Sequence, residues 1–111
     1  MIGGNVEAKL QIRSVGEKNA IGQRATLWMD VAILSGWLDL STGDSKHTSY
    51  NAKVQESTHI FIMDYQPFEK RIRAENARLI ISDTVYDVML IDDPMQMHRQ
   101  LEIYLKYTGG Q

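Results

Sequence analysis

The amino-acid sequence predicts a mainly β protein, folded as a small antiparallel β-barrel or a tight β-sandwich of about six strands. Residues 6–12 alternate strictly between apolar and polar side chains, which is typical of a strand with one buried face. Residues 24–40 are rich in β-branched and aromatic residues and follow no helix cap. Residues 77–107 contain three short apolar runs separated by polar turns. Short connections of this kind favour a meander without helices.

The first two strands are joined by a predicted loop at residues 14–23, where two glycines and several charged residues indicate a mobile hairpin-type connection. In the second strand, alternation places one set of residues on one face, namely Leu27, Met29, Val31 and Ile33. The other face carries Trp28, Asp30, Ala32 and Leu34. Ser35-Gly36 predicts a bulge or bend, because glycine inside a strand often marks a kink.

A polar segment at residues 41–57 interrupts the strands and forms a long loop between the second and third of them. A structureless loop of this length inside a small domain is uncommon, and is usually functional or disordered. Asp44 or Ser45 is a candidate cap for one short helix ending near Gln55.

The remaining strands are predicted from apolar runs. Residues 58–65 are nearly continuous in apolar and β-branched residues, as expected of a central strand covered on both faces. Residues 68–76 are charged and irregular, with room for one helical turn. The last three strands are expected at residues 79–82, 85–91 and 101–107, with turns at Asp83-Thr84 and at Asp92-Asp93-Pro94. The inward positions of the final strand are Leu101, Ile103, Leu105 and Tyr107.

Length and composition indicate a single domain, residues 1–111, with flexible ends at residues 1–5 and 108–111. The sequence lacks cysteine, a signal peptide and a membrane-spanning run, so we expect a soluble cytoplasmic protein that does not bind membranes. The net charge of −2 argues against a protein that coats duplex DNA. The densest basic stretch, residues 70–78, is balanced by Glu69 and Glu75, which is typical of a solvated face.

No catalytic, phosphate-binding or dinucleotide-binding motif occurs, so we expect a protein that is not an enzyme and needs no cofactor or metal. The three histidines, His47, His59 and His98, have no metal-ligand spacing. Asp92-Asp93 could hold a divalent cation, yet acidic residues before proline are also what a strand-ending turn prefers. Trp28 and Trp37 are expected to pack, whereas Tyr50 stands alone in the polar segment and is a candidate contact residue.

The order of these elements resembles the bacteriophage head–tail joining family (head–tail adaptor or stopper proteins) across residues 8–107. The resemblance covers the first strand at residues 8–13, the tryptophan-containing strand at 26–32, the polar loop at 41–57 and the strand at 59–62. It continues through residues 77–81, 85–88, 91–94 and 101–105. Its most telling part is Tyr86-x-Val88 followed by Ile91-Asp92.

The resemblance implies a structural protein of the phage neck, assembled in the host cytoplasm and located in the virion at the head–tail interface. It implies a homo-oligomeric ring, twelve-fold in the family, that docks beneath the portal and adaptor proteins and receives the tail. In the family, the loop between the second and third strands projects toward the central channel, where it helps to retain packaged DNA. Carried over, residues 41–57 become the gate.

The candidate gate residues are Asp44, Lys46, His47, Tyr50, Lys53 and Glu56, and the interface candidates are Arg71, Arg73, Arg78 and Tyr104. The charges of the polar segment nearly cancel, so a gate made from it would close the channel sterically and attract phosphate only weakly.

Two rival hypotheses come from other functional classes. A barrel that binds single-stranded nucleic acid would use Trp28, Trp37 and the basic stretch at residues 70–78. A metal-assisted hydrolase would use Asp92, Asp93 and His98.

Overall fold

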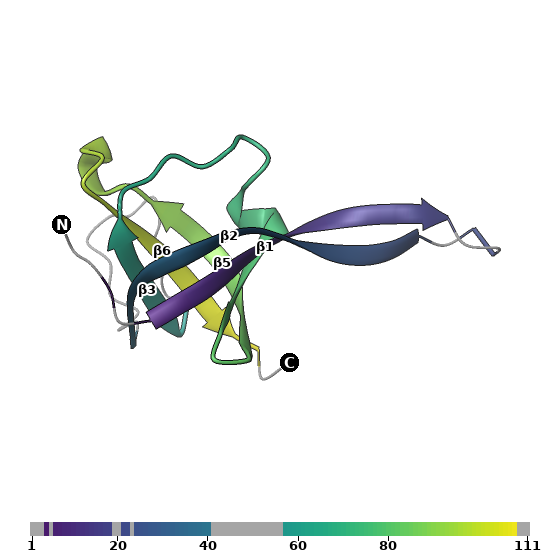
Figure 1. Cartoon of the computed structure of the whole chain (residues 1–111), viewed down its shortest axis with the longest axis horizontal. Helices are drawn as coiled ribbons and strands as arrows, with labels where there is room; N and C mark the ends of the chain where they lie inside the picture. Colours follow the sequence, from purple (N-terminus) through teal and green to yellow (C-terminus); the bar gives the residue numbers. More distant parts are fainter. Residues whose placement is uncertain (1–3, 5, 19–20, 23, 41–56, 109–111) are drawn as a thin grey trace.

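The protein is a closed antiparallel β-barrel (Figure 1). The structure, a computed structural model, describes residue 4 and residues 6–18, 21–22, 24–40 and 57–108, with residues 15–18 and 24–26 described through their backbone only. The strands are β1 Val6–Lys18, β2 Arg24–Leu40, β3 His59–Asp64, β4 Ala77–Ile81, β5 Thr84–Asp92 and β6 Gln100–Tyr107. Two 3-10 turns, η2 Ala74–Asn76 and η3 Pro94–Gln96, precede β4 and β6. The strand order around the barrel is β1-β2-β3-β6-β5-β4, so the predicted mainly β fold and the barrel are confirmed.

The longest strands, β1 and β2, continue together beyond the barrel as a two-stranded arm, which consists of residues 13–18 and 24–28 (Figure 1). Pairing of β1 with β4 ends at Ile12, whereas pairing of β1 with β2 continues to Lys18 opposite Arg24. The arm makes the molecule elongated, with extents of 48 × 27 × 26 Å. The prediction of a loop over residues 14–23 is therefore wrong for residues 14–18, because pairing with β2 supplies hydrogen-bond partners that local composition does not reveal.

A register shift in β2 decides which side chains face the core. Leu10 pairs with Ala32 and Gln11 pairs with Asp30, so Val31 is the extra residue of a bulge. The bulge that the sequence predicted at Ser35-Gly36 lies at Val31 instead. Gly36 serves another purpose, because an added Cβ would lie 2.4 Å from the carbonyl oxygen of Ile62.

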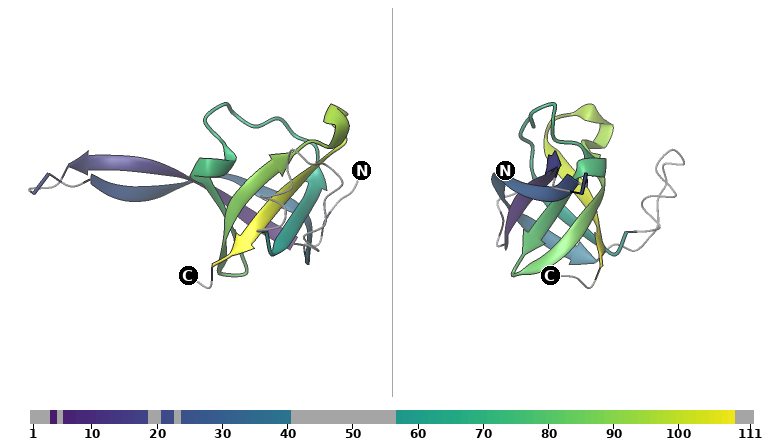
Figure 2. Two further views of the ribbon diagram at one scale, coloured as in Figure 1. Left: turned by 180° about the vertical axis from the view of Figure 1, so that it is seen from behind. Right: turned by 90° about the vertical axis from the view of Figure 1, so that its right-hand side faces the viewer.

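The core fills the barrel interior, and the right-hand view of Figure 2 shows the strands that enclose it. Its largest fully buried side chains are Phe61, Leu10, Leu34, Leu79, Ile103 and Leu105. The inward positions predicted for β6 are confirmed at residues 101, 103 and 105, but Tyr107 is 49% exposed, because pairing of β6 with β3 ends at Leu105. Coverage of β3 on both faces is also wrong: Phe61 and Met63 are buried, whereas Ile60 and Ile62 are only half-buried on the outside of the barrel.

The two turns of the final meander both use left-handed backbone. Ile81 pairs with Thr84, so the β4–β5 turn is Ser82-Asp83, one residue earlier than predicted. Both turn residues have positive φ, 49° and 65°, which matches the right-handed twist of a hairpin. In the β5–β6 connection, Met95, Gln96 and His98 also have positive φ. Predictions for residues 1–3, 5, 41–56 and 109–111, including the short helix and the mobile ends, lie outside the described residues.

Candidate functional surfaces

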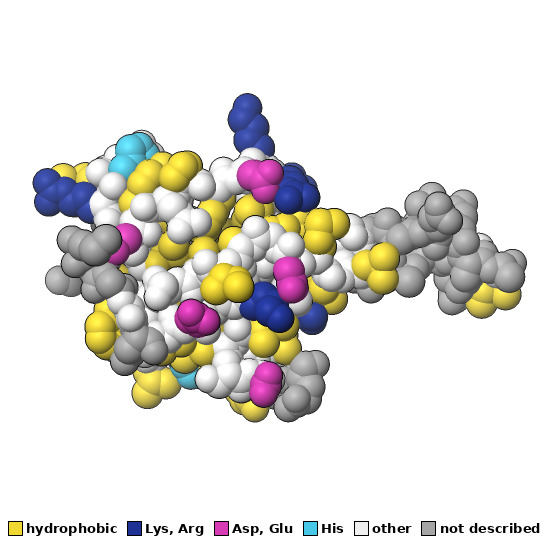
Figure 3. All heavy atoms as spheres, in the orientation of Figure 1, with side chains coloured by type: hydrophobic (Ala, Val, Ile, Leu, Met, Phe, Trp, Pro, Cys, Tyr) yellow, Lys and Arg dark blue, Asp and Glu magenta, His cyan; other side chains and the backbone are white. Residues whose placement is uncertain are grey.

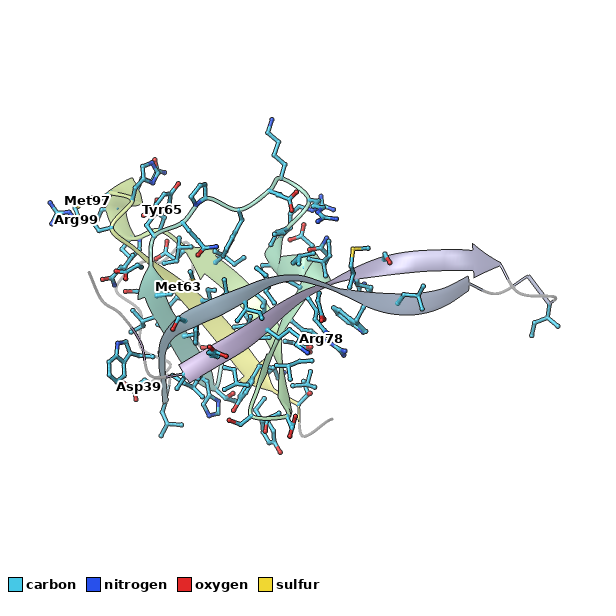
Figure 4. All side chains as sticks on the ribbon, viewed as in Figure 1. Asp39, Met63, Tyr65, Arg78, Met97 and Arg99 are labelled. Carbon is cyan, nitrogen blue, oxygen red and sulfur yellow. The ribbon has the colours of Figure 1, made fainter. Side chains whose placement is uncertain are left out.

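A polar network crosses three strands where the arm leaves the barrel. Arg78 of β4 donates from Nε to Oε1 of Gln11 on β1 at 2.8 Å, and its guanidinium carbon lies 4.1 Å from the ring centroid of Trp28 on β2. Gln11 donates in turn to Oδ1 of Asp30 at 2.6 Å. Figure 4 labels Arg78 at this side of the barrel. Arg78, expected as an interface residue, thus braces the root of the arm.

The network also involves Lys9, whose Nζ lies 3.7 Å from Oδ2 of Asp30. A network of this kind combines a cation–π contact with charge-assisted hydrogen bonds, which are stronger than neutral ones. It ties β4, β1 and β2 together on the outer face. The expectation that Trp28 packs holds in this form, because its ring lies under the guanidinium of Arg78.

The segment between β3 and β4 carries the other basic candidates in self-compensating pairs. Arg71 lies 3.1 Å from a carboxylate oxygen of Glu69, and Arg73 lies 3.6 Å from one of Glu75. Asn76 holds the segment in shape by accepting from the Arg73 backbone N–H and donating to the Arg71 carbonyl, each at 2.9 Å. Because both arginines are exposed and paired, this surface has little excess positive charge for phosphate.

Tyr104 lies on the outside of β6 and donates to Oε1 of Glu102 at 3.2 Å. Partial burial, followed by the negative charges of Glu102 and Asp92, raises the pKa of Tyr104 to about 12. The phenol is therefore a neutral hydrogen-bond donor at physiological pH. The arrangement suits a contact residue and supplies no proton-transfer chemistry near neutral pH.

The β5–β6 connection lies on the side of the molecule away from the arm (Figure 1). Asp93 accepts from the backbone N–H of His98 at 3.0 Å and pairs with its ring Nδ1 at 2.5 Å. The His98 ring also packs on Tyr65, with 4.5 Å between centroids. This clamp presents Met95 and Met97 to solvent, and Figure 4 labels Met97 and Arg99 on this side.

The residues of the hydrolase hypothesis meet only in part. Asp93 and His98 lie together, but no group of three His, Cys, Asp or Glu side chains suited to a metal ion occurs among residues 6–14, 27–40 and 57–108. A shallow depression of about 220 Å³ lies elsewhere, on the outer face of β1, β2 and β4. Its lining is Glu7, Ala8, Lys9, Ile33, Ile80, Ser82 and Asp83.

Apolar side chains on the outside of the molecule are a feature that the sequence did not reveal. Leu27 and Met29, on the face of β2 that continues the barrel interior, are 54% and 44% exposed, because no second sheet covers the arm. Figure 3 shows hydrophobic side chains scattered over the visible face, without one large patch. Trp37, expected to pack, is 44% exposed.

The candidate gate residues, Asp44, Lys46, His47, Tyr50, Lys53 and Glu56, lie outside the described part of the chain. Ser57, the residue that follows them, is buried. Of the described helical turns, none has the length and apolar character needed to cross a lipid bilayer.

Taken together, these surfaces define a closed six-stranded barrel with a two-stranded arm projecting on one side and a methionine-bearing loop on the other. No protein-family model matches the chain, and no curated protein sequence matches it significantly. The solved structures that are similar in fold include the following two. Protein SF1141 from Shigella flexneri 2a, determined in solution, has a TM-score of 0.68 and 16% identity, over 100% of this chain and 98% of that chain. A chain from the virion of a native gene transfer agent particle has a TM-score of 0.59 and 10% identity, over 91% of each chain.

Proposed function

We propose that this protein is a structural component of a phage-type virion, and specifically a ring-forming protein of the neck between head and tail. The observation that carries the proposal is the similarity of almost the whole fold to a chain from a gene transfer agent virion. The resemblance of strand order to the head–tail joining family supports the same role independently. In this role the ring docks beneath the portal and adaptor proteins, and presents its other side to the tail.

The shape of the subunit supports a mechanical role. Its two ends differ, since strand pairing places the root of the arm and the 93–98 clamp at one end of the barrel and the β4–β5 turn at the other. A subunit with unlike ends can be placed between two different partners, with one end toward the head and one toward the tail. Heterologous contacts around an axis then close a ring, for which we propose twelve copies.

Removal of the gene from the phage that encodes it tests the neck role. We expect tailless heads and complete tails to accumulate separately, with infectious particles restored when the gene is supplied in trans. Electron microscopy of the lysate distinguishes tailless heads, free tails and complete particles. Normal particles without the gene, or a failure to make tails at all, would contradict the neck role.

Within this role, residues 41–57 are proposed to retain packaged DNA by closing the channel. The test replaces residues 41–56 with a short Gly-Ser linker, and the matched control scrambles the same residues at constant length. If the plug is steric, the shortened variant loses DNA from heads before the tail joins, which nuclease sensitivity measures, while the scrambled variant retains it. Equal retention by both would remove the gate from the proposal.

A barrel that binds single-stranded nucleic acid is the second candidate, favoured by the exposure of Trp37 on the barrel. Against it, Arg78 covers Trp28, and Arg71 and Arg73 are paired with carboxylates. Titration of the protein with an oligonucleotide at low salt decides the matter. Quenching of tryptophan fluorescence that salt reverses would support nucleic-acid binding, and an unchanged signal would dismiss it.

A further inference from the structure

The arm has two backbone edges that no described strand covers. The outer edge of β1 loses its β4 partner after Ile12, which leaves residues 14–18 bonded on one side only. The outer edge of β2 gains its β3 partner at Gly36, which leaves residues 24–35 open in the same way. An open strand edge is a row of unpaired N–H and C=O groups, and it recruits further strands.

The open edge of β2 also lacks two of the residue types by which proteins protect such edges. Residues 24–35 contain neither proline nor lysine, the residues that most often block edge pairing. A two-stranded ribbon is at best marginally stable in water. Leu27 and Met29 add exposed apolar surface to it. A third strand beside the arm would pair the open edge, stabilise the two-stranded ribbon and cover the exposed apolar side chains.

We propose that this third strand comes from a second copy of the same chain, with the β1 edge of one arm pairing with the β2 edge of the next. β1 runs toward the tip of the arm and β2 runs back (Figure 1). When two arms lie side by side and point the same way, β2 of one therefore meets β1 of the next in antiparallel orientation. Each arm offers one edge of each kind, so a ring of copies uses every edge and leaves none open.

Charge complementarity favours this pairing. Arg13 on β1 and Asp30 on β2 are both exposed, and they lie on the same face of the arm, because Gln11 opposes Asp30 and Arg13 opposes Trp28. Strands in a closed, tilted sheet are staggered relative to one another. A stagger of about two residues between copies places Arg13 of one copy beside Asp30 of the next, as opposite charges on neighbouring strands prefer.

The dimensions indicate where the joined arms would lie. Across its long axis the molecule measures 26 to 27 Å, whereas a pair of strands occupies only about 10 Å. Arms can pair side by side only if they converge on the ring axis while the barrels stay outside. In the proposed neck ring, the arms would therefore line the channel. This inference rests on the ring of the proposed function and names the contact that closes it.

Cross-linking of purified protein at high concentration tests the pairing, and the absence of cysteine from the sequence makes the test clean. With the same stagger, Ser14 of one copy opposes Met29 of the next, so Ser14→Cys and Met29→Cys proteins are mixed and oxidised. We expect the mixture to form a disulfide-linked dimer that joins one protein of each kind, in excess of the dimers that either protein forms alone. The control mixture of Met29→Cys with Met95→Cys, which lies on the other side of the molecule from the arm, should give none. A Met29–Met29 product as the main species, or no excess over the control, overturns the proposal.

Charge exchange provides a second readout. Arg13→Asp and Asp30→Arg should each lower the cross-linking yield severalfold, and the double variant should recover it. Arg99→Asp, also exposed but on the side of the molecule away from the arm (Figure 4), should leave the yield unchanged. The outcomes are separable from those of the neck role: rings that form without the 14–29 cross-link refute arm pairing alone. Normal virions after gene removal refute the neck role and leave a cross-linked arm intact.

Discussion

The guanidinium of Arg78 stacks on the ring of Trp28, 4.1 Å from its centroid, and so connects β4 to β2 across the intervening β1. The contact sits where the arm leaves the barrel. It fixes the direction of the arm through a side chain that also bonds Gln11.

Arg78→Ala should lower the free energy of unfolding by about 1–2 kcal/mol, because it removes the cation–π contact and a charge-assisted hydrogen bond. Denaturant unfolding measures the change, and the emission of Trp28 should shift as its ring becomes hydrated. Arg73→Ala, which loses only an exposed ion pair, should cost at most about 0.5 kcal/mol. Equal effects of the two substitutions would show that Arg78 does not brace the arm.

Neighbouring residues in β2 provide a test of which face is buried. Leu34 is 1% exposed and Ile33 is 71% exposed. Leu34→Ala should destabilise the protein by about 2–5 kcal/mol through lost burial and a cavity, whereas Ile33→Ala should stay within about 0.5 kcal/mol. Thermal unfolding compares the two. If Ile33→Ala destabilised the protein more than Leu34→Ala, the bulge would not lie at Val31.

Gly36 lies where β2 passes from pairing with β1 to pairing with β3. A methyl group there would lie 2.4 Å from the Ile62 carbonyl oxygen and 2.8 Å from the Phe61 ring. Gly36→Ala should therefore cost about 1–3 kcal/mol through overpacking. Gly22→Ala serves as the control, because nothing lies within 4 Å and only its φ of +84° opposes a side chain. Gly22→Ala should lower the free energy of unfolding by about 1 kcal/mol.

Tyr104 predicts how stability changes at high pH. Its pKa is raised from 10.0 to about 12 in the folded protein. Below the pKa of tyrosine in the unfolded chain, the folded and unfolded states both keep the phenol protonated, so the free energy of unfolding does not change with pH through this group. As pH rises toward about 12, the unfolded chain ionises first and the folded state loses stability. Tyr104→Phe should remove this component of the pH dependence. Glu102→Gln should lower the pKa of Tyr104 only in part, because burial is the larger cause.

The clamp formed by Asp93 and His98 should control the order of the β5–β6 connection. Asp93→Ala removes the acceptor of the His98 backbone N–H and should speed hydrogen exchange there, at a cost of about 1 kcal/mol. Asp93→Asn keeps a side-chain carbonyl oxygen and should preserve most of the protection. Unchanged exchange in Asp93→Ala would show that the positive φ values of residues 95, 96 and 98 are held by other contacts.

Several parts of the fold follow from local pattern. The alternation in residues 6–12 and the apolar runs of β3, β4, β5 and β6 determine which segments become strands, because side chains on a strand alternate between faces. The same alternation correctly placed Leu101, Ile103 and Leu105 in the core. The three short apolar runs of residues 77–107 and the polar turns between them predicted the meander of β4, β5 and β6.

Other features depended on tertiary structure, and each has a physical reason. Residues 14–18 have loop-like composition and become a strand only because β2 lies beside them. The inward face of β2 depends on the bulge at Val31, and one inserted residue exchanges the two faces of a strand. Arg78 and Trp28 are 50 positions apart in sequence and meet only because β4 closes the barrel against β1. Local sequence determined where the strands run, whereas closure of the barrel decided which residues meet and which edges stay open, since pairing between distant strands leaves no periodic signal in the chain.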